Sequence, residues 1–116
     1  MKPLFKRSFL VFLIVVFSSP AFSKPVAILP ADKTATLGEV IAIDGSSSFD
    51  EEGNNLTYSW SLDISPQNFN SQIDNPTNSS ISFTADTAGF YLIRLIVNNG
   101  TENSYPAYMV IRVKGN

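Results

Sequence analysis

The side chains best suited to chemistry in this sequence are carboxylates, because cysteine and histidine are both absent. Their absence removes thiol nucleophiles, disulfides, the usual zinc sites and the commonest general base. The densest acidic cluster is Asp50-Glu51-Glu52, with Asp44 close in the sequence and Asp86 on a second loop. Calcium binds several oxygen ligands from carboxylates and backbone carbonyls. This cluster is therefore a candidate calcium site.

The same carboxylates have a structural alternative. Asp44 and Asp50 stand in a loop rich in Gly, Ser and Asn, where such side chains commonly accept backbone N–H bonds in turns. Catalysis by a pair of carboxylates would require a cleft and one raised pKa, which a surface loop of a small domain does not provide. The sequence also lacks a nucleophile–base pair. We therefore expect the protein not to be an enzyme.

The first 23 residues have the pattern of a secretory signal peptide. Three basic residues, Lys2, Lys6 and Arg7, precede the apolar run 9–17, and Ala21-Phe22-Ser23 provides small residues for cleavage after Ser23. An uncleaved anchor is the alternative, but nine apolar residues are too few for a span of about 20. Without a cysteine there is no lipoprotein attachment point. We expect a secreted or periplasmic protein with no stable membrane span.

Residues 24–116 are expected to form one domain with its own hydrophobic core. Removing residues 1–23 removes three of the eight basic residues and none of the ten acidic ones, which leaves a net charge of −5. A nucleic acid or an anionic membrane would favour the opposite sign. The sequence thus argues against a nucleic-acid partner.

Alternation of apolar and polar residues predicts a strand around Trp60. Leu56, Tyr58, Trp60 and Leu62 share one face, and the intervening residues are polar. Trp60 is the only tryptophan, and a ring of this size is expected at the centre of a core with a partner for its N–H.

Further short strands are expected at 26–29, 34–37, 39–44, 80–84, 90–97 and 108–113, and the irregular segment 64–78 could add one around Phe69. No stretch after residue 23 has helical periodicity. About seven strands separated by turn signals predict an all-β, immunoglobulin-like β-sandwich. Its predicted core comprises Ile41, Ile43, Trp60, Ile81, Phe83, Tyr91, Ile93, Leu95, Val97, Met109, Ile111 and Val113.

The strand 90–97 has apolar residues on both faces. If Tyr91, Ile93, Leu95 and Val97 are in the core, then Phe90, Leu92 and Ile96 point away from it, beside Tyr108 of the last strand. Val110, Arg94 and Arg112 should lie among them. Apolar surface with aromatic residues and arginines is typical of interfaces. Phe90, Leu92, Ile96 and Tyr108 are therefore candidate partner-binding residues, unless the segment 64–78 covers them.

A family resemblance rests on five motifs taken together: Asp44-Gly45-Ser46-Ser47-Ser48-x-Asp50, Gly53-Asn54, Leu56-x-Tyr58-x-Trp60, Phe83-x-x-Asp86-x-x-Gly89 and Tyr91-x-Ile93-x-Leu95-x-Val97-x-Asn99-Gly100. With these motifs, residues 25–114 resemble the polycystic kidney disease (PKD) domain. The resemblance implies an extracellular β-sandwich that contacts proteins or carbohydrates or acts as a spacer. Some secreted PKD domains bind calcium at an Asp-x-Asp-Gly turn, which here falls on Asp50, Glu52 and Gly53.

Two functions are therefore expected from the sequence. The first is a non-enzymatic binding or adhesion module that contacts a protein or glycan, with Asp50, Glu52 and Asp86 as candidate calcium ligands. The second is a structural component of an envelope or surface that forms a homo-oligomer or joins a larger complex through its sheet edges.

Overall fold

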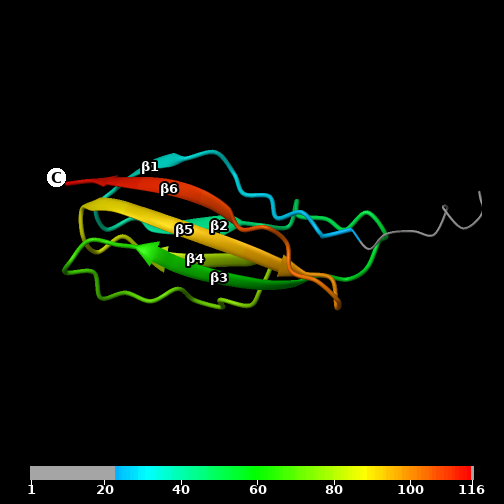
Figure 1. Ribbon diagram of the computed structural model, residues 1–116. Coiled ribbons are helices and arrows are strands. Elements are labelled where there is room, and N and C mark those ends of the chain that lie inside the picture. Colours follow the sequence, from blue (N-terminus) through cyan, green and yellow to red (C-terminus); the bar gives the residue numbers. More distant parts are fainter. Residues whose placement is uncertain (1–22, 116) are drawn as a thin grey trace, which may run out of the picture.

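The computed structural model describes residues 23–115 as two packed β-sheets without a helix (Figure 1). The strands are β1 (Lys33–Thr36), β2 (Val40–Asp44), β3 (Thr57–Ile64), β4 (Ser80–Thr84), β5 (Gly89–Asn98) and β6 (Ala107–Lys114). One sheet has the order β1-β6-β5-β3, and the other contains β2 and β4. The predicted all-β, immunoglobulin-like sandwich is confirmed, with six strands rather than seven.

The missing strand is the one predicted at 26–29. Only Val26 pairs there, in an isolated bridge with Phe49. The N–H of Ile28 donates to Ser48 Oγ at 2.9 Å instead of joining a ladder. Pro25 and Pro30, which flank this run, have no N–H to extend the pairing. The predicted signal peptide, apart from Ser23, lies outside the described residues. Within residues 23–115 we find no helix of the length and apolarity needed to cross a bilayer.

The four-stranded sheet is held together by antiparallel pairs around β5. β5 pairs with β3 on one side, where Trp60 is opposite Leu95, and with β6 on the other, where Met109 is opposite Ile93. β1 adds a parallel pair at the edge of β6. The predicted alternation along β5 is confirmed, because Tyr91, Ile93, Leu95 and Val97 are all fully buried.

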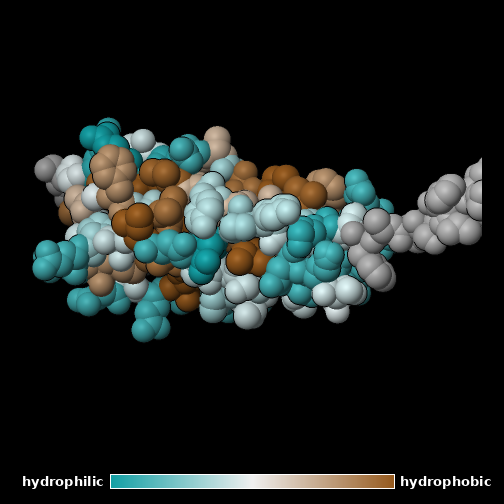
Figure 2. Space-filling model, in the orientation of Figure 1, coloured by the Kyte–Doolittle hydropathy of each residue, from teal (hydrophilic) through white to brown (hydrophobic). Residues whose placement is uncertain are grey.

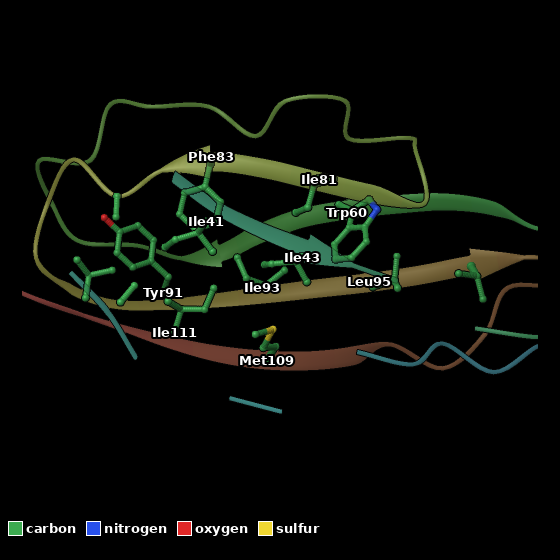
Figure 3. Close-up of a cluster of buried hydrophobic side chains, with 14 residues drawn as sticks. Ile41, Ile43, Trp60, Ile81, Phe83, Tyr91, Ile93, Leu95, Met109 and Ile111 are labelled. Atoms are coloured by element: carbon green, nitrogen blue, oxygen red, sulfur yellow. The ribbon is translucent and has the colours of Figure 1, made fainter. Parts of the chain in front are cut away.

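The core lies between the sheets and contains the twelve residues predicted for it (Figure 3), whereas Leu56, Tyr58 and Leu62, on the predicted inner face beside Trp60, are only partly buried against it. Trp60 is 5% exposed, and its indole N–H donates to the carbonyl of Asn78 at 2.7 Å, which satisfies its polar group. At the other end, the hydroxyl of Tyr91 donates to the carbonyl of Thr87. This bond is the tyrosine corner of immunoglobulin-like sandwiches.

The segment 64–78 closes one open side of the sandwich. Asp74 forms a bridge with Ser82 of β4, and the N–H of Trp60 donates to the carbonyl of Pro76 at 3.1 Å. Phe69 does not form the predicted strand. Its ring packs edge-on against Phe83 and Tyr91, at centroid distances of 6.0 and 5.1 Å. The segment therefore adds to the core between the sheets.

The backbone of Gly45 lies close to the ring of Trp60. A Cβ at this position would lie 2.8 Å from Leu95 Cδ2 and 2.8 Å from Trp60 Cζ2. Both neighbours are in the core and have little room to move.

We predict that Gly45→Ala lowers the free energy of unfolding by about 1–3 kcal/mol, because the added methyl overpacks the core. Gly115→Ala is the matched control, since its Cβ would meet Ala88 Cβ at an ordinary 3.9 Å. Urea denaturation of both variants measures the difference. Equal stability of the two variants would show that the contact with Trp60 is looser than described.

Candidate functional site: the acidic loops and the outer sheet face

Asp50 joins two loops at one end of the sandwich. Its side chain is 9% exposed, and its Oδ2 accepts hydrogen bonds from the backbone N–H and the side-chain amide of Asn54, at 3.1 and 2.9 Å. Oδ1 accepts a hydrogen bond at 3.0 Å from Nδ2 of Asn99, which lies in the connection between β5 and β6. The bond from Asn99 lowers the pKa of Asp50, burial opposes it, and Asn54 lowers it further. The Asp50 carboxylate therefore holds the two loops together through hydrogen bonds.

Asp86 has an equivalent role in a different place. Its Oδ2 accepts bonds from the backbone N–H groups of Asn70 and Ser71, at 3.3 and 3.0 Å, and from Ser71 Oγ at 2.9 Å. Thr87 Oγ1 donates to Oδ1 at 3.0 Å. Partial desolvation alone would raise the pKa of Asp86, but these hydrogen bonds outweigh it and lower the pKa. Asp86 thus holds the segment 64–78 against the turn between β4 and β5.

The structure does not bring the predicted calcium ligands together. Asp86 precedes β5, whereas Asn99, which contacts Asp50, follows it. A strand of ten residues separates these ends by about 30 Å. Glu52 is exposed, and residues 23–115 contain no group of three or more acidic side chains arranged to hold a metal ion. The oxygens of Asp50 already accept N–H donors, so the site predicted from Asp50, Glu52 and Asp86 does not fit calcium.

The four predicted partner-binding residues do share one surface, the outer face of the four-stranded sheet. Phe90 and Tyr108 are 59% and 51% exposed, and Leu92 and Ile96 are half-buried among their neighbours. The pairing register places Phe90 beside Arg112, Leu92 beside Val110 and Arg94 beside Tyr108. Figure 2 shows apolar atoms gathered over β5 and β6 towards the left of the view.

A β-bulge adds Ile64 to this outer face, although the sequence pattern assigned the residue to neither face. Simple alternation from Trp60 and Leu62 would turn Ile64 inward. The register shifts between Leu62 and Ile64, so that Ile64 is opposite Leu92 on the outer face and 57% exposed. Ile64, Leu92 and Val110 therefore form a continuous apolar row across three strands.

The segment 64–78 does not cover this face, contrary to the alternative that the sequence allowed. It contacts Ser82 and Phe83 of β4, Asp86 and Thr87 of the following turn, Tyr91 on the inner face of β5, and the backbone of β3 at Trp60. In Figure 1 it runs below β3 and β4, away from β6. Of the row Ile64–Leu92–Val110, Ile64 is exposed and Leu92 and Val110 are half-buried.

The fold and the open face define an immunoglobulin-like module of a small, helix-free type. The family model described as "K319L-like, PKD domain" matches residues 30–113. The chain therefore belongs to the PKD domain family, as the motifs predicted. Domains of this family are typically extracellular adhesion or binding modules and are generally not enzymes.

Solved structures agree with this assignment. The PKD domain from the KIAA 1837 protein is 25% identical, with a TM-score of 0.66 over 84% of this chain and 94% of that one. The PKD domain from human KIAA0319 is 15% identical, with a TM-score of 0.66 over 84% and 88% of the two chains, which shows the common fold.

A nucleoside hydrolase-related hypothetical protein from Saccharophagus degradans, associated with carbohydrate metabolism, is 27% identical with a TM-score of 0.68. The match covers 81% of this chain but only 26% of that one, so it concerns about a quarter of the larger protein. No curated protein matches the chain.

Four carboxylates that accept hydrogen bonds in the folded protein predict a loss of stability in acid. The pKa values of Glu39, Asp44, Asp50 and Asp86 are all lower than the ordinary values of 4.5 for Glu and 3.8 for Asp, which apply when the chain is unfolded. Each group therefore stabilises the fold above its unfolded pKa, and this contribution is lost as the pH falls through its lower folded pKa. The melting temperature should be nearly constant from neutral pH to about pH 5 and fall below about pH 4.5.

Asp50→Asn should lower the melting temperature at neutral pH by several degrees and make the decline in acid shallower. Glu51→Gln changes an exposed carboxylate of the same loop. It is expected to leave the melting temperature at neutral pH and its decline in acid unchanged. Thermal denaturation followed by circular dichroism across this pH range measures both variants. If Asp50→Asn behaves like Glu51→Gln, the hydrogen bonds to the Asp50 carboxylate contribute nothing to stability.

Proposed function

We propose that the protein is a secreted or periplasmic, non-enzymatic module that binds a protein or glycan through the outer face of its four-stranded sheet. The observation that carries this proposal is the open apolar row Ile64–Leu92–Val110, flanked by the exposed rings of Phe90 and Tyr108. Large apolar side chains that stay in contact with water cost free energy, and contiguous patches of them mark interaction sites. Membership of the PKD family supports a binding role.

The carboxylates support a role without catalysis. A carboxylic acid that donates a proton near neutral pH needs a raised pKa, usually through burial in a cleft. Asp44, Asp50 and Asp86 have lowered pKa values, because each accepts hydrogen bonds from neighbouring N–H or hydroxyl groups. These groups are arranged to stabilise loops.

The pattern of residues 1–23 supports export. Cleavage after Ser23 would leave Lys24 as the first residue, next to Glu102, with which its side chain forms an ion pair at 3.7 Å. Mass spectrometry of the exported protein tests this directly, since the mature chain should begin at Lys24.

Self-assembly through a sheet edge is a second candidate, and the two-stranded sheet favours it. In the described part of the chain β2 pairs only with β4, so one edge of β2 has no strand beside it. Val40 on this strand is 65% exposed. Natural proteins usually protect such edges with charged residues, proline or bulges. This candidate predicts a dimer on a sizing column, whereas the binding module is expected to be a monomer.

We predict that the double variant Leu92→Thr, Ile96→Thr loses binding to its partner while it keeps the fold. Threonine suits a strand and removes apolar area, so the stability should change by less than about 1 kcal/mol. The measurement is retention of proteins or glycans from the extracellular or envelope fraction of the producing cells, with wild type and variant immobilised in parallel.

Val40→Thr is the matched control, because it removes an exposed apolar side chain from the other sheet and should leave retention unchanged. Leu95→Thr, on the buried face of β5, should cost about 2–5 kcal/mol. If Leu92→Thr destabilises the fold as much as Leu95→Thr, the outer face is covered and the proposal is wrong.

A further inference from the structure

Most of the basic residues of 24–116 are on the outer sheet face. Of the five in residues 24–116, Arg94, Arg112 and Lys114 lie on it: Arg94 is opposite Tyr108, Arg112 is opposite Phe90, and Lys114 follows two residues later on β6. Two of the ten acidic residues lie on or beside this face: Asp63, which pairs with Arg94, and Asp32, whose carboxylate accepts the N–H of Val110 at the end of the row. The face is positive on a chain that is otherwise strongly negative.

Two of these cations have no carboxylate partner within the described residues. Arg94 is neutralised, since its Nε lies 3.4 Å from Asp63 Oδ1 and 3.0 Å from Ser61 Oγ. Lys24 and Lys33, away from this face, pair with Glu102 and Glu39 at 3.7 and 3.5 Å. Arg112 and Lys114 are exposed and form no ion pair in residues 23–115. Positive charge is therefore available directly beside the apolar row.

We infer that the occupant of this face is an acidic, apolar segment of another protein. Its apolar side chains would cover Ile64, Leu92 and Val110, and its carboxylates would pair with Arg112 and Lys114. A guanidinium presents its donors in a planar fork that fits a carboxylate, and charge pairs at the edge of an apolar contact fix its register. This inference rests on the proposed function and specifies the chemistry of the partner.

A second copy of the chain fits this face less well. Two such faces placed together bring positive charge to positive charge, and the two carboxylates there are already engaged, Asp63 with Arg94 and Asp32 with the N–H of Val110. An anionic membrane could supply negative charge, but the net charge of −5 on residues 24–116 opposes its approach. An acidic segment of a different protein supplies both the charge and the apolar groups.

The experiment selects short random peptides from a display library on the purified full chain. The expected peptides carry Asp or Glu beside Leu, Phe or Trp, and on binding they shift the NMR signals of β3, β5 and β6. The double variant Arg112→Gln, Lys114→Gln should bind them about tenfold more weakly, as expected for the loss of two exposed charge pairs. Lys24→Gln with Lys33→Gln changes the net charge equally away from this face and should bind them normally.

Peptides without acidic enrichment, or equal effects of the two double variants, would overturn the inference. It would also be overturned by a concentration-dependent dimer that Leu92→Thr abolishes, or by binding to phosphatidylglycerol vesicles without peptide binding. If the peptides bind this face and are lost with Leu92→Thr but do not respond to Arg112→Gln and Lys114→Gln, the inference fails and the proposed function stands. If the peptides bind another surface, both the inference and the proposed function fail.

Discussion

The packing of β2 and β4 against one face of the larger sheet is the constraint on which the structure depends. Two strands can cover only one side of a four-stranded sheet, and Trp60 and Tyr91 fill the space between the layers. Trp60 is fixed by its bond to Asn78, by the close approach of Gly45 and by Leu95 opposite it on β5. Because the apolar residues of β5 occur on both of its faces, Phe90, Leu92 and Ile96 are left outside this core.

The loops are held by hydrogen bonds to carboxylates rather than by disulfides. Asp50 connects the loop before β3 to the connection after β5, and Asp86 connects the segment 64–78 to the turn before β5. A domain without cysteine has to fix its loops in another way. Asp50 and Asp86 therefore hold the loops at the two ends of β5.

The sequence was sufficient for the fold and the faces of its strands, because alternation with period two is a local property. Trp60 and the four buried residues of β5 could be assigned in this way. The bulge at Asp63, which turns Ile64 outward, depends on pairing with β5 and leaves no local signal. The distance between Asp50 and Asp86 also depends on which loops meet in space, so the sequence could not show that these two candidate calcium ligands lie at opposite ends of β5. The outward position of Lys114 could have been predicted by extending the alternation of the last strand by one residue.

The most direct test of the open outer face uses the absence of cysteine from the chain. Leu92→Cys and Leu95→Cys introduce single thiols on the two faces of the same strand. A thiol-specific reagent should modify the first in the native protein, though more slowly than in denaturant because Leu92 is half-buried, and the second only after unfolding. If both thiols are equally protected in the native monomer, the outer face is covered, and the account of this protein as a binding module with an exposed sheet is contradicted.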